Sequence, residues 1–318
     1  MTDLEHAALI AVRDCLGLQS SETLLIVTDA PQARLARVLA EAARPLVCEV
    51  LTLEYGVREL NGQEPPDPVP AAMAGVDAVL AVTTRSITHT AARRAATAAG
   101  ARVATMPGIT EDCLVRTMNA DYHAIAARTE RLAARLTEAR VARVTSAAGT
   151  DITLPIAGIT AVPSTGLILK PGQWGNLPSG EAYMMPEEGK AEGLVVVDAS
   201  LAGIGRLLEP VRITVERGQA VAVEGGEQAR RFNEQLDKAG PRARNCAELG
   251  VGTNDRAVVT GAILEDEKIL GTVHIAFGNN ASMGGTVDVA FHVDGILLRP
   301  TLSIDGEVIL RDGTPLFD

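Results

Sequence analysis

The sequence predicts an α/β protein with a doubly wound parallel sheet in its N-terminal domain, followed by a mixed, mainly antiparallel β-rich (α+β) domain. The first third alternates short, continuous apolar strands with helical segments, which is typical of a parallel sheet covered on both faces. Beyond about residue 140, short strands are separated by turns rich in Gly, Asp and Pro. With 318 residues, the chain is long enough for two cores, and we place the domains at 1–120 and 121–318.

The elements of the first domain follow from periodicity and from helix-ending residues. Helical spacing of apolar residues predicts helices over 4–18, 32–43 and 88–99, and a Pro-rich link precedes a further short helix. Apolar runs predict strands at 23–28, 46–53, 78–82 and 102–105. Gly100 ends the third of these helices as a C-cap residue. No GxGxxG follows a strand, so nothing in this domain indicates a bound dinucleotide.

In the second domain, a long polar helix over 121–139 is expected to act as a connector. Short alternating runs predict strands at 141–145, 151–154, 193–197, 211–215 and 220–223, and one helix spans 227–239. The end of the chain, 302–309, is expected to form a hairpin around an Asp305-Gly306 turn.

Charge and hydropathy exclude several classes of partner. The formal net charge of -11 argues against nucleic acid, because phosphate contacts need clustered Lys and Arg. No apolar run approaches the roughly 20 residues needed to span a bilayer, so no membrane association is expected. The acidic N-terminus lacks a signal-peptide pattern, and we expect a cytoplasmic protein.

The stretch 265–278, followed closely by 291–295, has the composition of a metal site. Each half is typical of a strand, and the turn 279–285 is able to make the two strands neighbours. Because side chains two positions apart lie on one face of a strand, His292 and Asp294 should project together. A second histidine, His274, lies on the nearby strand, and imidazole beside carboxylate is metal-ligand chemistry.

Two further segments each carry one carboxylate among turn residues. Residues 175–181 are expected to form a loop that ends at Glu181, and residues 247–254 a loop that presents Glu248. Glycines in the second loop allow close approach of the backbone. Taken alone, a glutamate in such a loop is most often a solvated surface charge.

Together, these motifs resemble the aminopeptidase T family of metallopeptidases. The resemblance is clearest over about 107–313 and rests on five segments in the same order: Pro-Gly-Ile-Thr at 107–110, Asn-Leu-Pro-Ser-Gly-Glu at 176–181, Ala-Glu-Leu-Gly-Val-Gly-Thr-Asn at 247–254, Gly-Thr-Val-His-Ile-Ala at 271–276 and His-Val-Asp at 292–294. It implies a site for two divalent ions (Zn, Co or Mn), with these ligands: Glu181, Glu248, His274, His292 and Asp294. Glu267 is a sixth candidate that requires a local gap in the correspondence.

The chain departs from the peptidases at one position. They have a catalytic tyrosine shortly after the histidine of the Gly-Thr-Val-His segment, and Ala281 stands at the position that corresponds to it. A divergent branch of the same superfamily resembles 2,5-dihydroxypyridine dioxygenases, which use one Fe(II). In that case His274, His292 and Asp294 would hold the iron, and Glu181 and Glu248 would serve in acid–base roles or support the ligands.

The sequence therefore favours a metal-dependent hydrolase acting on a small amide, peptide-like or cyclic substrate through a metal-activated water, with Glu181 and Glu248 also catalytic. The alternative is a mononuclear Fe(II) dioxygenase that opens a dihydroxypyridine-like ring. A non-catalytic module stabilised by metal is a third reading. The expected partners are a small molecule or short peptide and a second copy of the chain in a symmetric homodimer, which the resemblance and the need to cover strand edges both indicate.

Overall fold

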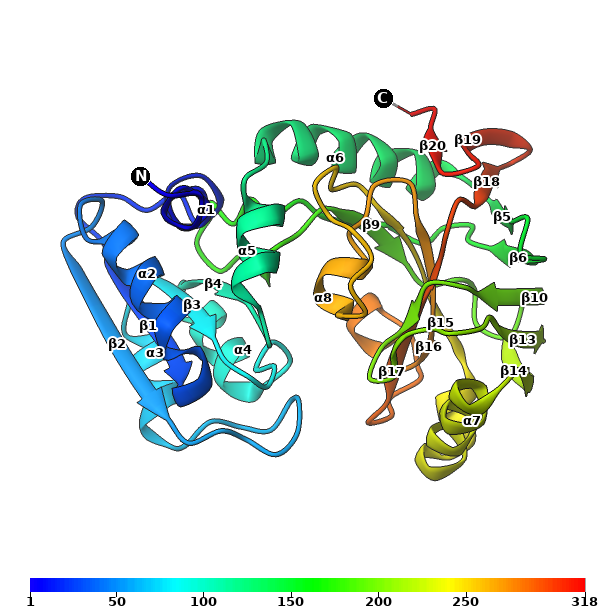
Figure 1. The fold of residues 1–318 in the computed structure, drawn as a ribbon, viewed down its shortest axis with the longest axis horizontal. Helices are drawn as coiled ribbons and strands as arrows, with labels where there is room; N and C mark the ends of the chain where they lie inside the picture. The colour runs from blue at the N-terminus through cyan, green and yellow to red at the C-terminus, as the bar shows by residue number, and fades with distance from the viewer. Residues whose placement is uncertain (318) are drawn as a thin grey trace. The chain divides into compact units, whose positions relative to one another are not determined.

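The computed structural model describes residues 1–317, and its chain divides into two compact units (Figure 1). The first unit consists of Met1–Ala124 and Gly166–Ser179, and the second of Ile125–Thr165 and the chain from Gly180 onward. Residues 166–179 therefore belong to the first unit, whereas the boundary predicted from the sequence, at residue 120, places them in the second domain. They do so because they add a strand to the first unit's sheet.

The first unit is built on a parallel five-stranded sheet of order β2-β1-β3-β4-β8. Its strands are β1 (Thr23–Asp29), β2 (Glu49–Tyr55), β3 (Ala78–Val82), β4 (Arg102–Thr105) and β8 (Trp174–Asn176). The central strands β1, β3 and β4 are almost wholly buried, as expected for a parallel sheet with both faces covered.

Helices cover this sheet in two groups. The helices are α1 (Asp3–Ile10, continued by the π-helical turn η1, Ala11–Cys15), the short η2 (Ala30–Gln32), α2 (Ala33–Ala43), α3 (Pro68–Ala74), α4 (Ala91–Ala98) and α5 (Glu111–Met118). Helix α1 packs against α2 and α5, whereas α3 packs against α4. Val69 and Met73 of α3 share a core with Leu25 and Val27, and the intervening Ile26 is also fully buried.

Helix α6 (Tyr122–Glu138) begins in the first unit and leads into the second, so it is the connector that was predicted over 121–139. The second unit contains an eight-stranded sheet, β14-β13-β10-β6-β5-β18-β19-β20, and a seven-stranded sheet, β12-β11-β17-β16-β15-β9-β7. The eight-stranded sheet comprises β5 (Val141–Thr145), β6 (Asp151–Pro155), β10 (Glu192–Val197), β13 (Val211–Glu216), β14 (Gln219–Glu224), β18 (Thr301–Ile304), β19 (Glu307–Arg311) and β20 (Thr314–Pro315). All of its pairings are antiparallel.

The seven-stranded sheet, which is also antiparallel, carries the candidate site. Its strands are β7 (Val162–Ser164), β9 (Glu181–Met184), β11 (Ser200–Leu201), β12 (Gly205–Arg206), β15 (Cys246–Gly252), β16 (Val273–Gly278) and β17 (His292–Leu297). The remaining helices of the unit are α7 (Glu227–Ala239), η3 (Pro241–Arg244), α8 (Ile263–Asp266) and η4 (Ala281–Met283). Both sheets, α6 and α7 contribute to one continuous hydrophobic core.

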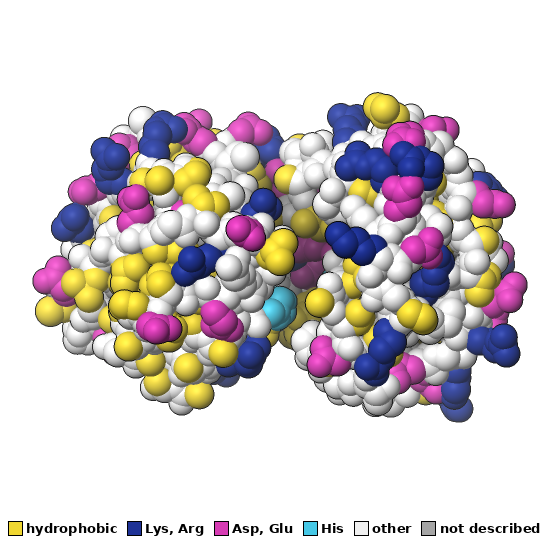
Figure 2. Space-filling model, turned by 90° about the horizontal axis from the view of Figure 1, so that it is seen from below, with side chains coloured by type: hydrophobic (Ala, Val, Ile, Leu, Met, Phe, Trp, Pro, Cys, Tyr) yellow, Lys and Arg dark blue, Asp and Glu magenta, His cyan; other side chains and the backbone are white. Residues whose placement is uncertain are grey.

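The predicted fold class is confirmed: a parallel α/β unit is followed by a mainly antiparallel β-rich unit. The terminal hairpin also has the predicted turn, since Asp305 and Gly306 both adopt positive φ between β18 and β19. Among the described residues, no helix has the length and apolar character that a bilayer span requires. On the face drawn in Figure 2, acidic and basic side chains are interspersed and form no large patch of one sign.

Candidate metal site

Four neighbouring strands of the seven-stranded sheet bring the predicted ligands together. Glu181 lies on β9, Glu248 on β15, His274 on β16, and both His292 and Asp294 on β17. The antiparallel register aligns Glu248 with Ala276 and Ala276 with Asp294, so these three residues form one row across the sheet. Directly paired residues share a face, and Ala276 is small enough to leave space between the two carboxylates.

The alternate residues of the same strands point into the hydrophobic core. They are Ala182, Met184, Leu249, Val251, Val273, Ile275, Phe277, Val293 and Leu297. This alternation corrects one expectation from the sequence: Glu181 and Glu248 lie on strands and not in turn-rich loops. The glycines that follow Glu248 belong to a fully buried strand, where the His274 ring lies over Gly250 and the backbone of Ile269 lies against Gly252.

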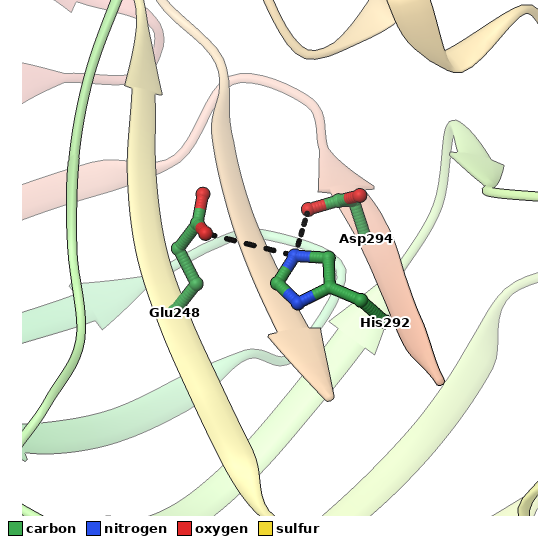
Figure 3. A group of neighbouring side chains, drawn as sticks. All are labelled: Glu248, His292 and Asp294. Carbon is green, nitrogen blue, oxygen red and sulfur yellow. Dashed lines mark ion pairs between the residues drawn. The ribbon is translucent and has the colours of Figure 1, made fainter. Parts of the chain in front are cut away.

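Glu248, His292 and Asp294 form a group whose ligand atoms all lie within 4.8 Å of one another. His292 Nε2 lies 3.6 Å from Glu248 Oε2 and 3.4 Å from Asp294 Oδ1. Figure 3 shows the two carboxylates on either side of this ring nitrogen, with Glu248 reaching it from a different strand. The His292 side chain is 34% exposed, whereas both carboxylates are buried, so the group opens to solvent on the imidazole side.

The orientation of His292 is set by a backbone contact. Its Nδ1 lies 2.8 Å from the carbonyl oxygen of Asn279, in the turn between β16 and β17. A carbonyl only accepts hydrogen bonds, so Nδ1 carries the proton and donates it. Nε2 is then the nitrogen available to a metal ion, and this is how metal-ligating histidines are commonly held.

His274 is fully buried beside this group and lies directly over Gly250. A Cβ atom at Gly250 would lie 1.9 Å from His274 Nε2, so only glycine leaves room for the ring. Nε2 lies 3.2 Å from Glu248 Oε1 and 3.5 Å from Glu181 Oε2. Glu248 thus faces both imidazoles, one with each oxygen. Within residues 1–317, neither His274 Nδ1 nor Glu181 Oε2 has a hydrogen-bond partner.

Glu267 and Lys268 complete the surroundings of the site. Lys268 is 1% exposed, and its Nζ lies 2.6 Å from Glu181 Oε1 and 2.5 Å from Glu267 Oε1. Glu267 follows the short helix α8, where the sequence suggested continuous strand. The helix forms there because the Asp266 carboxylate accepts hydrogen bonds from Thr260 and from the Gly261 backbone, which folds the segment back on itself.

Lys268 was not among the predicted site residues, although it lies within the stretch 265–278 that has the composition of a metal site. A lysine next to three acidic residues is normally a surface charge, so its neighbours in the sequence give no signal. Only the strand pairing that brings Glu181 to this position makes the lysine part of the site.

Clustering of carboxylates shifts the pKa values of both histidines. Burial lowers the pKa of His274, but its hydrogen bond to Glu248 and the charge of Glu181 outweigh burial and raise it to about 9. Burial also lowers the pKa of His292, but the Asp294 and Glu248 carboxylates outweigh burial and raise it to about 10. For Asp294 the sign is reversed: burial raises its pKa, but the charge and hydrogen bond of His292 lower it to about 2.

The residues fit a divalent metal ion. The ligand atoms of Glu248, His292 and Asp294 share a small volume, with His274 beside Glu248, and a mixed nitrogen and oxygen set suits Fe, Mn, Co or Zn. Nε2 of His292 is oriented toward this volume, and Oε2 of Glu181, which has no hydrogen bond among residues 1–317, lies 3.5 Å from His274 Nε2. In the absence of metal, protons on the two imidazoles compensate the carboxylates, as the raised pKa values indicate.

Comparison with known proteins places these observations in a family context. The family described as 2,5-dihydroxypyridine 5,6-dioxygenase (NicX) matches residues 14–316. A 2,5-dihydroxypyridine 5,6-dioxygenase of Pseudomonas putida is 26% identical over 191 residues, which are 56% of this chain and 55% of that protein. Aminopeptidase T of Thermus aquaticus is 28% identical over 191 residues, 52% of this chain and 44% of that protein. The matches thus span about half the length of these relatives.

Solved structures show the same fold. The 2,5-dihydroxypyridine dioxygenase of Pseudomonas putida superimposes with a TM-score of 0.85 at 19% identity, covering 99% of this chain and 98% of that chain. Wild-type AmpT of Thermus thermophilus superimposes with a TM-score of 0.73 at 20% identity, covering 99% of both chains. The predicted resemblance to both branches is confirmed, and the relatives of both kinds are enzymes.

Proposed function

The chain belongs to the 2,5-dihydroxypyridine 5,6-dioxygenase family, and on that premise we propose that it is an Fe(II)-dependent dioxygenase that opens a hydroxylated heteroaromatic ring. The observation that carries the proposal is the close group of Glu248, His292 and Asp294, beside which His274 Nε2 lies 3.2 Å from Glu248 Oε1. In this proposal, His274, His292 and Asp294 would hold the iron. Two histidines and one carboxylate are the ligand set of many non-haem iron oxygenases.

In this proposal, the bound iron supplies the site at which O₂ and the substrate hydroxyl groups are activated together. The protein supplies ligand orientation and proton transfer. His292 keeps its Nε2 directed inward through the hydrogen bond from Nδ1 to Asn279, and His274 is held over Gly250. Glu248 contacts both rings and is buried, so it is the group placed to accept the proton of a substrate hydroxyl.

A hydrolase of the aminopeptidase T kind, which the sequence alone favoured, is the second candidate. The observation in its favour is the number of carboxylates around the site, because two-ion hydrolases use carboxylates to bridge and flank their ions. Against it, Glu181 and Glu267 are both engaged by Lys268. The relation to Aminopeptidase T, at 28% identity, is compatible with either reaction.

Oxygen consumption distinguishes the two reactions. Protein reconstituted anaerobically with Fe(II) and then given 2,5-dihydroxypyridine and air should consume one O₂ per ring opened, with both oxygen atoms entering the product as a ring bond breaks. The same protein loaded with Zn²⁺ or Co²⁺ should leave amino-acid p-nitroanilides intact. The hydrolase would be supported instead if the protein cleaved the p-nitroanilides under nitrogen and consumed no oxygen in air with any dihydroxypyridine.

A further inference from the structure

Lys268 is a buried cation whose two partners are both carboxylates of the candidate site. Its side chain is 1% exposed, and its ammonium group lies 2.6 Å from Glu181 and 2.5 Å from Glu267. Lysine is almost never buried to this extent unless it is paired. The ammonium group therefore holds these two acids together in the way that a bound cation does.

The backbone fixes where this ammonium group lies. Lys268 N donates to Glu265 O, and Lys268 O accepts from Asn254 N, so the residue is tied at both sides. The preceding Asp266 is buried and accepts hydrogen bonds from Ser200 Oγ and from Thr260. The Lys268 ammonium group is therefore held by a segment whose backbone and neighbouring side chains are fixed by hydrogen bonds, and its position is part of the folded structure of the site.

Glu181 connects this cation to the ligand group. One of its oxygens, Oε1, binds Lys268, and the other, Oε2, faces His274 Nε2 at 3.5 Å with no hydrogen bond among residues 1–317. In two-metal enzymes, a carboxylate commonly links two ions that lie about 3.5–4 Å apart. Here the same kind of carboxylate has an ammonium group on one side and a proposed metal ligand on the other.

We propose that the Lys268 ammonium group permanently occupies the place of a second divalent ion, so that this chain holds a single metal ion. Glu181 then acts as a positioning residue between Lys268 and His274. The assignment rests on the metal site of the proposed function and is independent of the reaction catalysed there. Its physical basis is charge: an ammonium group bound between Glu181 and Glu267 satisfies both acids and repels a dication at the same position.

Metal stoichiometry tests this inference without any assay of activity. Purified full-length protein is saturated with Mn²⁺, freed of excess ion, and measured by elemental analysis and by electron paramagnetic resonance, which separates isolated from coupled Mn²⁺. We expect one isolated ion per wild-type chain. Lys268→Ala should bind a second ion at least ~100-fold more tightly than wild type, because the repelling charge is gone and two buried acids are left free.

Two variants serve as controls. Lys190→Ala removes an exposed lysine that forms a comparable 2.5 Å ion pair with Glu187, and it should keep one ion. Lys268→Arg retains the positive charge and should also keep one ion. If Lys268→Ala does not fold, two ions in either wild type or Lys268→Arg would still overturn the inference.

The outcomes separate this inference from the proposed function. Two ions in wild type, or one ion in a folded Lys268→Ala protein, overturn the role of Lys268 and leave the dioxygenase open. A wild-type protein that binds no ion removes the metal site and both proposals with it. One isolated ion in wild type and a coupled pair in Lys268→Ala support the inference even if no oxygen is consumed.

Discussion

The two faces of the seven-stranded sheet are made by the same strands and have opposite properties. On one face, Leu249, Ile275 and Val293 pack into the core that both sheets share. On the other, Glu248, His274 and Asp294 converge on the candidate metal site. One residue step along a strand therefore separates packing from chemistry, which places the ligands on a rigid support.

The difference between the faces is also energetic. Each apolar side chain on the core face stabilises the fold, at about 25 cal/mol per Å² of apolar surface removed from water. The ligand face collects buried carboxylates, whose charges must be compensated by protons, by Lys268 or by a metal ion. The core face makes the fold stable enough to carry this unfavourable concentration of charge.

Removing a ligand should break the chemistry and spare the fold. His292→Ala is expected to lose bound metal and to lower turnover by about 1000-fold or more, because the ion both holds and activates the reactants. The ring is 34% exposed, so no large cavity forms in the core. Elemental analysis and thermal unfolding measure the two effects, and His123→Ala, an exposed histidine on α6, is the matched control. Wild-type metal content in His292→Ala would contradict the site.

A change on the opposite face of the neighbouring strand should have the reverse effect. Ile275→Ala removes a fully buried side chain between two residues of the ligand face, and it should lower the free energy of unfolding by about 2–5 kcal/mol. Metal stoichiometry at low temperature should remain that of wild type. Denaturant unfolding and elemental analysis check this. Metal loss in a protein that is still folded would show that the two faces are not separable.

Gly250→Ala should displace His274 because the added Cβ would lie 1.9 Å from its Nε2. We expect metal affinity to fall by about 10–100-fold, the range typical when the orientation of a ligand is disturbed. Titration with Mn²⁺ measures it. Gly56→Ala is the matched control, since Gly56 has open space around its Cα and should leave affinity unchanged. An unaltered affinity in Gly250→Ala would mean that the ring is not held there.

Proton competition should give metal affinity a pH dependence of clear sign. In the metal-free protein the raised pKa values, about 9 for His274 and about 10 for His292, mean that metal binding at pH 7 displaces protons. Affinity should therefore rise by roughly tenfold or more per pH unit between pH 6 and 8. Calorimetry in buffers of different ionisation enthalpy counts the released protons, and none released would contradict these values.

The same shifts predict opposite pH trends for the stability of the two forms. A folded-state pKa above the unfolded value stabilises the protein at low pH, and this stabilisation is lost as the pH rises through the folded value. The metal-free protein should thus become less stable from about pH 6.5 to 10, whereas the metal-bound protein should not follow this trend. Melting temperatures with a chelator and with Mn²⁺ test the difference.

Much of the fold could be predicted because its signals are local. Strands β3 and β4 and helix α7 have the bounds that their apolar spacing predicts. A buried strand or an amphipathic helix can be recognised from the spacing of apolar residues within its own segment. The return of β8 to the first unit was not predictable. Its three residues include Gly175 and Asn176, which carry little strand preference, and they are fixed only by pairing with β4.

The candidate site divides in the same way. The sequence was enough to place His292 and Asp294 on one face with His274 on a nearby strand, because alternation along a strand and a short turn are local rules. Three features required the folded chain: Glu181 and Glu248 both face His274 from strands, Gly250 makes room for His274, and Lys268 is buried between two acids. These features depend on which strands become neighbours, and pairing between distant segments is set by the packing of the whole sheet.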